Sequence, residues 1–300
     1  MTIFKGNQVQ LFNRLLTNMN LSLSLRSIAL AVTAITAMGA LSVHAADLPL
    51  PDRIKKAGKL VIATQANYPP IAYKNPETGQ MMGLDIELGE AIAKELGLKV
   101  EYQETAFAQV FSSLATGRVD IAMVAISDTA ERQKVADFID YMKTGPQFFT
   151  LQANAAKIKG IADVCGTKVG ASRNTNWPVQ IAAWSTDNCV AKGKAAITVI
   201  GTEGSVDART QLKTGRIDVA VQGSETLPYF QTMEANTYVL LGQPLFQQET
   251  GIPVSKTEPV LRAAVLGALQ NLQRNGTYDK LLAKYKLQSS SMPVAVNQGK

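Results

Sequence analysis

Short apolar runs and segments of helical periodicity alternate along the first half of the chain. Residues 59–63 form an apolar run that ends at a loop with two prolines, which is typical of a buried strand. Residues 85–96 carry apolar side chains at helical spacing and precede Gly97, so they predict an amphipathic helix with a glycine cap. The alternation continues with a strand at 99–103, a helix over 107–114 and a second buried strand over 119–126. This order predicts an α/β fold.

The second half of the chain repeats this alternation. Strands are expected at 168–171, 196–200 and 217–222, with one helix starting at Trp177 and another over 206–212. Two nearly matching stretches, LATGRVDIA at 114–122 and LKTGRIDVA at 212–220, lie 98 positions apart. Each combines a helix end, a glycine cap and the start of a strand. The match predicts two lobes of related topology.

The C-terminal part is expected to be helical and then irregular. A helix is predicted over 261–272, followed by an Asn275-Gly276 break and a second helix over 277–286. Residues 288–300 are rich in Ser and Gln and have little apolar content, which predicts a loose tail.

The N-terminal segment has the pattern of a secretory signal peptide. Ser27 to Val43 is a charge-free run of 17 residues that follows Arg26 and precedes the small residue Ala45. The alternative is a membrane anchor, but the run is short and only mildly apolar for that role. We therefore expect residues 1–45 to be removed and the chain to be exported to the periplasm. Met1 and Met19 are both candidate starts, and Met19 leaves a signal of ordinary length.

Removal of residues 1–45 changes what the composition implies. The segment holds three basic residues and no acidic one, so the net charge falls from +6 to +3. That small excess does not indicate a nucleic-acid partner. The single histidine, His44, leaves with the segment. A chain without histidine has no imidazole metal ligand and no Ser-His or Cys-His dyad, so no metal or other cofactor is expected.

The chain contains two cysteines, Cys165 and Cys189. Two cysteines exclude a four-cysteine zinc site. In an oxidising compartment a lone pair usually forms a disulfide, which is the pairing expected here. The alternative is a pair of buried free thiols.

Four loops at predicted strand ends carry candidate binding chemistry. In open α/β sheets, ligands bind beyond the carboxyl ends of strands, where helix N-termini point. The loops and their candidate residues are 65–71 with Tyr68, 125–132 with Arg132, 172–177 with Thr175 and Asn176, and 222–225. Arg132 offers a planar fork suited to a carboxylate. Each residue has a simpler alternative: Tyr68 as a rim residue, Arg132 as an exposed arginine, and Thr175 or Asn176 as a helix cap.

Several motifs, taken in order, resemble one known family. They are Tyr68-Pro-Pro70, Met82-Gly-Leu-Asp-Ile-Glu87, Gly117-Arg-Val-Asp-Ile-Ala-Met123, Ser127-Asp-Thr-Ala-Glu-Arg132 and Gly276-Thr-Tyr-Asp-Lys280. The chain is similar, over about residues 52–287, to the bacterial extracellular solute-binding proteins of the polar amino-acid class. Asp163-Val-Cys-Gly-Thr-Lys168 with Cys189 resembles a branch that carries a cysteine pair in the second lobe.

The resemblance implies a two-lobe periplasmic-binding-protein fold with two crossover hinge strands and a ligand cleft between the lobes. Lobe 1 would comprise 52–145 plus 246–287, and lobe 2 would comprise 146–245. Carried over residue by residue, Tyr68 and Phe107 would pack on the ligand. Arg132 would bind its carboxylate together with Ser127 and the backbone near Ala125. Thr175 and Asn176 would complete that contact from lobe 2.

Two positions depart from the family pattern. Gly223 stands where an acidic residue commonly binds the α-ammonium group, and Gln65 stands at another commonly acidic or polar position. A buried ammonium group without an anionic partner is costly. Either Glu225 or Glu203 supplies the charge, or the ligand is not a plain α-amino acid.

The resemblance implies the binding subunit of an ABC importer. Such a protein is a monomer, captures an amino acid or amino-acid-like small carboxylate by hinge closure, and delivers it to a permease with its ATPase. It is not an enzyme. The first alternative is a periplasmic dehydratase of the cyclohexadienyl type on the same fold, with a general acid such as Glu225. The second is a sensor or cell-wall enzyme module, which would need a further domain or anchor.

Overall fold

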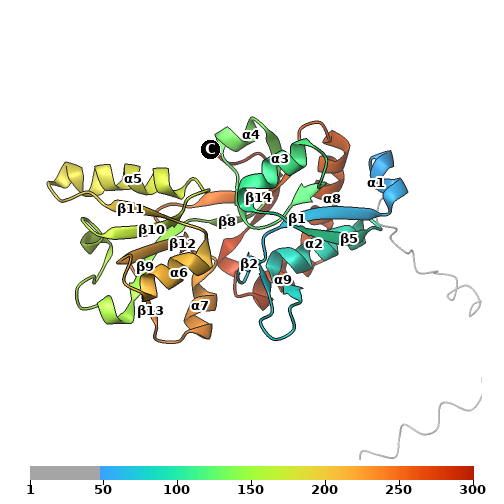
Figure 1. Cartoon of the computed structure of the whole chain (residues 1–300). Helices are drawn as coiled ribbons and strands as arrows, with labels where there is room; N and C mark the ends of the chain where they lie inside the picture. Colours follow the sequence, from blue (N-terminus) through green and yellow to red (C-terminus); the bar gives the residue numbers. More distant parts are fainter. Residues whose placement is uncertain (1–47) are drawn as a thin grey trace, which may run out of the picture. The chain divides into compact units, whose positions relative to one another are not determined.

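A computed structural model describes residues 48–300, which form two α/β lobes (Figure 1). The predicted signal peptide lies outside the described residues. Among residues 48–300, no helix has both the length and the apolar character required to cross a membrane.

Lobe 1 is built on the larger sheet. Its strands run in the order β15-β8-β14-β6-β1-β5, and β7 pairs with β14. These strands are β1 (Lys59–Thr64), β5 (Lys99–Glu104), β6 (Ile121–Ala122), β7 (Ile126–Ser127), β8 (Ala136–Thr144), β14 (Gln248–Ser255) and β15 (Ser291–Val296). The helices are α1 (Asp52–Ala57), α2 (Leu84–Glu95), α3 (Val110–Ala115), α4 (Ala130–Gln133), α8 (Pro259–Arg274) and α9 (Thr277–Lys284). The apolar stripes of α2 and α8 pack with β1 and β14 into one core, as their helical spacing predicts.

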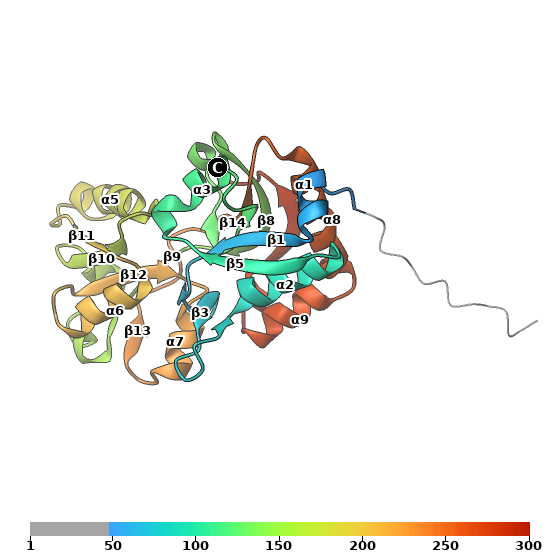
Figure 2. The same ribbon diagram turned by 45° about the vertical axis from the view of Figure 1, so that its right-hand side comes forward.

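Lobe 2 is built on a five-stranded sheet in the order β11-β10-β12-β9-β13. Its strands are β9 (Pro146–Leu151), β10 (Lys168–Ser172), β11 (Thr198–Thr202), β12 (Val219–Gly223) and β13 (Tyr238–Leu240). Its helices are α5 (Trp177–Asn188), α6 (Ser205–Lys213) and α7 (Leu227–Met233). A third, small sheet of β2 (Asn67–Tyr68), β3 (Ala72–Lys74) and β4 (Met81–Met82) precedes α2. In Figure 2 this small sheet lies beside α7 of lobe 2, and the Tyr73 and Tyr229 rings are 5.5 Å apart.

The related topology predicted from the repeated stretch is confirmed. In lobe 1, β1 pairs in parallel with both β5 and β6, and in lobe 2, β10 pairs in parallel with both β11 and β12. The two copies of the repeat contain the glycines that end the helices before β6 and β12. Gly117 and Gly215 both adopt a left-handed conformation, with φ of 67° and 71°.

Two adjacent crossover segments join the lobes. The first runs from β8 through Gly145 into β9, and the second leads from lobe 2 into β14. A Cβ added at Gly145 would lie only 1.8 Å from the carbonyl oxygen of Phe246. The two segments therefore approach each other so closely that only glycine fits at this position.

The strand expected over 119–126 is wrong as a single element. The structure has β6 paired with β1 and β7 paired with β14, with a break between them. The cause is Ala125, whose φ of 50° is incompatible with a continuous strand. Its amide nitrogen donates to a carboxylate oxygen of Asp85 at 2.9 Å, which stabilises the break. Period-based reasoning identified the buried run but not the turn inside it.

The loose tail predicted for residues 288–300 is also wrong. Residues 291–296 form β15, which pairs antiparallel with β8 at the edge of the lobe 1 sheet. Met292 and Val294 alternate with exposed residues and are buried, at 7% and 8% exposure. This period-2 alternation was visible in the sequence, but the surrounding Ser and Gln obscured it.

The expected disulfide between Cys165 and Cys189 is present in lobe 2. It joins the loop before β10 to the end of α5, with Cα atoms 5.5 Å apart. Cys189 is fully buried in the lobe 2 core.

A buried carboxyl group connects the lobes beside the crossover segments. Glu225, which follows β12, accepts a hydrogen bond of 2.6 Å from the Tyr68 hydroxyl and another from Thr144. Its side chain is 3% exposed, and burial raises its pKa to about 7. In lobe 1, burial likewise raises the pKa of Asp85 to about 6. Both carboxyl groups therefore retain their protons at pH values where an unfolded chain has lost them.

We predict that the free energy of unfolding falls as pH rises from about 4.3, where an unfolded glutamate titrates, to about 7. In that window the folded chain holds a proton on Glu225 that the unfolded chain releases. Glu225→Gln should flatten part of this slope, since an amide does not titrate. Urea denaturation at pH 4.5, 5.5, 6.5 and 7.5 measures the effect. Glu131→Gln, an exposed acid, is the matched control, and an equally steep slope in Glu225→Gln would contradict the prediction.

Candidate functional site

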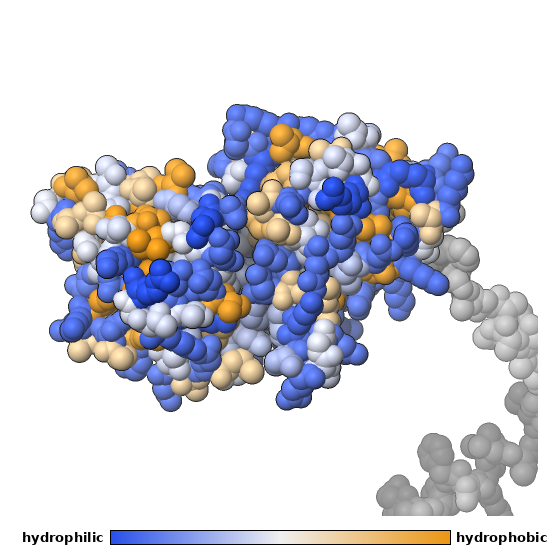
Figure 3. Space-filling view, viewed as in Figure 1, coloured by the Kyte–Doolittle hydropathy of each residue, from blue (hydrophilic) through white to orange (hydrophobic). Residues whose placement is uncertain are grey.

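A cavity lies between the lobes, where loops from both sheets meet. On the face shown in Figure 3, hydrophilic side chains dominate and a furrow separates the two lobes. Lobe 1 contributes Gln65, Asn67, Tyr68, Ala106, Phe107, Ala108, Val124, Ala125, Ser127 and Arg132 to the lining. Lobe 2 contributes Ser172, Asn174, Thr175, Trp177, Thr202, Glu203, Gly204, Ser205, Ala208, Val221 and Gln222. These loops follow the carboxyl ends of parallel strands, as the sequence predicts.

Arg132 supplies a cation to the lobe 1 wall. It lies on the short helix α4, whose N-cap Thr129 accepts a hydrogen bond from the Arg132 amide at 3.3 Å. The Arg132 guanidinium donates to the Ser127 carbonyl at 2.8 Å and lies 5.4 Å from the Phe107 ring centroid. Burial lowers the pKa of Arg132 to about 10, so the group remains charged at neutral pH.

Within the described residues, Asp128 is the acid whose charge acts on Arg132, but the two side chains do not form an ion pair. None of the ion pairs among residues 48–300 includes this side chain. Its guanidinium therefore keeps donors available for a ligand, and a carboxylate is the group whose geometry matches them.

A glutamine bridge connects the two lobes beside Ser127. Gln248, the first residue of β14, donates to the Ser127 hydroxyl at 2.7 Å. Its side-chain oxygen accepts from Asn176 at 3.3 Å and from Gln180 at 3.5 Å, both in lobe 2. Asn176 is thus engaged between the lobes and does not line the cavity. Ser127 accepts from Gln248 and keeps its own hydroxyl proton available to a ligand.

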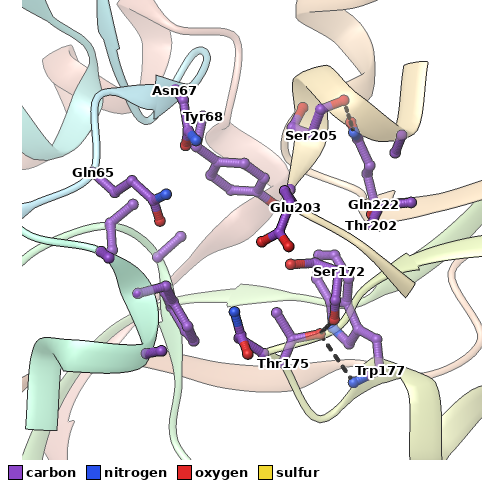
Figure 4. A pocket seen from close by; sticks show the side chains of 18 of the residues that line it. Gln65, Asn67, Tyr68, Ser172, Thr175, Trp177, Thr202, Glu203, Ser205 and Gln222 are labelled. Carbon is purple, nitrogen blue, oxygen red and sulfur yellow. Dashed lines mark hydrogen bonds between the residues drawn. The ribbon is translucent and has the colours of Figure 1, made fainter. Parts of the chain in front are cut away.

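Polar residues line the lobe 2 side of the cavity. Thr175 donates to the Ser172 carbonyl at 2.7 Å and accepts from the Trp177 amide at 3.3 Å, so it holds the start of α5 as well as lining the cavity (Figure 4). The buried Thr202 hydroxyl and the Trp177 indole nitrogen have no hydrogen-bond partner within residues 48–300. Buried polar atoms are usually paired, which makes these two groups exceptions among the lining residues.

Glu203 is the acidic residue that lines the cavity. Figure 4 shows its carboxylate directed toward the centre of the cavity. It is largely exposed and pairs with Arg173 at 3.1 Å. The loop that carries it follows β11. Glu203 was one of the two acids expected to supply a charge for an ammonium group, but its loop was not among the four strand-end loops predicted to form the site. The predicted order of parallel strands would have been sufficient to include it.

Three residues predicted to contact the ligand do not line the cavity. Asn176 is engaged with Gln248, and Glu225 is buried against Tyr68 and Thr144. A Cβ added at Gly223 would lie 2.1 Å from a Glu225 carboxylate oxygen. The Glu225 carboxyl group therefore occupies the space that a side chain at position 223 would need. The other predicted residues, Gln65, Tyr68, Phe107, Ala125, Ser127, Arg132 and Thr175, are all part of the lining.

Within residues 48–300, no group of three or more His, Cys, Asp or Glu side chains is arranged to bind a metal ion. The lining offers hydrogen-bonding groups, the Arg132 cation, the Glu203 carboxylate and aromatic surfaces.

Curated relatives share most of the chain's length. The L-cystine-binding protein TcyJ of Escherichia coli K12 is 26% identical over 262 residues, covering 87% of this chain and 95% of that protein. The L-arginine-binding protein of Pseudomonas aeruginosa is 26% identical over 231 residues, covering 75% and 86%.

Solved structures agree with the fold. An arginine-binding protein of T. maritima, solved as a mutant, superposes with a TM-score of 0.69 at 26% identity, covering 78% of this chain and 98% of that one. An ancestral amino acid-binding protein, described as a precursor of cyclohexadienyl dehydratase, gives 0.66 at 30% identity, with coverage of 78% and 98%. The model of one family matches residues 60–288. The chain belongs to the bacterial extracellular solute-binding proteins, family 3.

Proposed function

We propose that this protein captures an amino acid or a similar small carboxylate in the interlobe cavity and delivers it to an ABC permease and its ATPase. It would do so in the periplasm, as a monomer, after loss of the signal peptide. The observation that carries the proposal is Arg132, a half-buried cation that forms no ion pair within residues 48–300 and lines a cavity shared by both lobes. The relatives named for cystine and arginine binding support the same ligand class.

In the proposed complex, the ligand carboxylate binds Arg132 and the Ser127 hydroxyl, and Thr175 contributes from lobe 2. Tyr68 and Phe107 pack against the carbon skeleton. The ammonium partner is Glu203, because Glu225 lies outside the lining and Gln65 and Gly223 carry no charge. Glu203 is exposed and paired with Arg173, so its contact with the ligand ammonium group is weaker than the contact of Arg132 with the carboxylate.

We further propose that the protein binds its ligand without transforming it. The dehydratase alternative requires a general acid in contact with the ligand, and its candidate was Glu225. That carboxyl group is engaged with Tyr68 and Thr144 behind the cavity wall. Its position therefore supports a structural role for Glu225 at the lobe junction.

The direct test of the proposed function is a ligand screen. Purified mature protein should be stabilised by one or a few members of a panel of amino acids, cystine and small carboxylates, because a ligand that binds only the folded state raises the melting temperature. The bound compound should then be recovered and identified by mass spectrometry. Recovery of the unchanged compound supports binding, conversion to a new product supports the enzyme, and no stabilisation by any member counts against the proposal.

A second prediction concerns Arg132. Arg132→Ala should weaken binding of the ligand found in the screen by roughly 2–5 kcal/mol, since the desolvated carboxylate loses its cation. Arg132→Lys should lose less affinity than Arg132→Ala but should not reach the wild-type value, because an ammonium group cannot form the planar fork of a guanidinium. Calorimetry measures both, with Arg118→Ala, an exposed arginine outside the lining, as the control. Equal affinities in all four proteins would exclude Arg132 from the site.

A third prediction concerns closure. Ligand contacts from both lobes exist together only when the lobes are closed, so ligand should favour that state. The motion would occur at the two crossover segments near Gly145 and Phe246. Solution scattering should report a smaller radius of gyration with saturating ligand, and no change in Arg132→Ala under the same conditions. An unchanged radius for the wild-type protein would argue against closure.

A further inference from the structure

The chain after β15 continues across the surface of lobe 1 and reaches α4. Figures 1 and 2 place the C-terminus beside α3 and α4. Asn297 accepts from the Phe138 amide at 2.7 Å and donates to Asp137 at 3.1 Å, which attaches the segment to β8. The next amide, that of Gln298, donates to Asp140 at 2.8 Å.

The segment ends against the turn formed by residues 128–133, which follows Ser127 and contains Arg132. The Gly299 amide donates to the Asp128 carboxylate at 2.8 Å. The Gln133 side-chain amide donates to both Asp128 oxygens and to the Gly299 carbonyl, each at 2.9 Å. Asp128 is 1% exposed, so this network is buried where the C-terminal segment meets the turn.

The contact requires a glycine at position 299. A Cβ added there would lie 2.3 Å from the Asp128 carbonyl oxygen and 2.6 Å from its carboxyl carbon. The nearest of these atoms belongs to the backbone and cannot move aside without displacing the turn itself. The backbone of Gly299 therefore approaches the turn as closely as atomic radii allow.

The turn has little stability of its own. Helix α4 has only four residues, and a helix of that length is not stable without tertiary contacts. Asp128 and Gln133 both bind Gly299. Asp128 directly follows Ser127, and Gln133 directly follows Arg132, so each binds the C-terminal segment next to a residue that lines the cavity. Holding Asp128 and Gln133 in place therefore also fixes the backbone of Ser127 and Arg132.

We propose that residues 297–299 form a C-terminal strap that positions Ser127 and Arg132 for ligand binding. The strap lies beyond the family match, which ends at residue 288. Asp128, Gln133 and Gly299 are positioning residues, since they act through the turn and do not line the cavity. The effect on the turn stands on the contacts alone, whereas the effect on affinity rests on the proposed function.

The first experiment needs no ligand. Hydrogen–deuterium exchange of the unliganded mature protein is followed for the backbone amides of residues 129–133. Gly299→Ala, and truncation after Val296, should each speed exchange of the Arg132 and Gln133 amides at least threefold. Gln298→Ala is the matched control, because its strap contact is made by the backbone amide and its side chain bonds only to Val296. Exchange at the wild-type rate in both strap variants would overturn the proposal.

The second experiment measures affinity for L-arginine and L-cystine by calorimetry. Gly299→Ala should raise Kd three- to tenfold in the wild-type background and less than twofold in the Arg132→Lys background, because strap and guanidinium act as one unit. Equal losses in both backgrounds, or an unchanged Kd in the first, would overturn the positioning role. If the wild-type protein binds neither of these probes, the compound found in the ligand screen takes their place. If the screen finds none, the ligand class proposed above fails, and the exchange measurement alone decides whether the strap holds the turn.

Discussion

The site depends on holding one cation, the Arg132 guanidinium, in a partly desolvated cleft where no ion pair within the described residues includes it and only the nearby Asp128 charge opposes its burial. Burial disfavours the charge and lowers the pKa of the group, so its surroundings must compensate. The Phe107 and Phe111 rings, with centroids 5.4 and 5.7 Å from the guanidinium carbon, and the Ser127 carbonyl do so in part. The rest of the cost of burying the charge is not offset within the described residues, and a ligand carboxylate that pairs with Arg132 would offset it on binding. A fixed acidic partner would stabilise Arg132 but would compete with the ligand.

The second constraint is that two lobes share one cavity and, in the closure proposed above, must move relative to each other. The crossover segments meet at Gly145, where no side chain fits against Phe246. Polar contacts, not a continuous apolar core, connect the lobes around this point: Glu225 with Tyr68 and Thr144, and Gln248 with Asn176. The apolar clusters of the two lobes are separate, with the partly buried Tyr68 packed against both. Hydrogen bonds of this kind exchange readily with water, which suits a junction that opens and closes.

At position 223 this chain has a glycine where the family pattern commonly has an acid that binds the ligand ammonium group. The glycine removes an expected acid, and the sequence left Glu225 and Glu203 as the two candidates to replace it. In the folded chain the Glu225 carboxyl group fills the vacated space but bonds to Tyr68 from behind, so it positions an aromatic wall of the cavity. Glu203, from another loop, is the acid that faces the cavity. The acid that faces the expected ammonium site is therefore Glu203, which is more exposed than Glu225 and is already paired with Arg173.

The sequence by itself determined the local elements and their order. Apolar periodicity located most of the strands and helices, and the repeat at 114–122 and 212–220 indicated two lobes of one topology. The strand-end loops located Tyr68, Arg132 and Thr175, whereas Ser127 was expected from the family resemblance. These features follow from short-range pattern and from the rule that parallel strands end at a common edge.

Only the tertiary structure decided the rest. Whether Glu225 or Glu203 reaches the cavity depends on side-chain directions in two different loops. The β15 strand and its continuation to Asp128 depend on a pairing between segments about 150 residues apart, and the alternation at residues 291–296 does not indicate which segment is the partner. Contacts of that range are set by the packing of the whole lobe, because no local propensity distinguishes a residue that meets a partner from one that meets water.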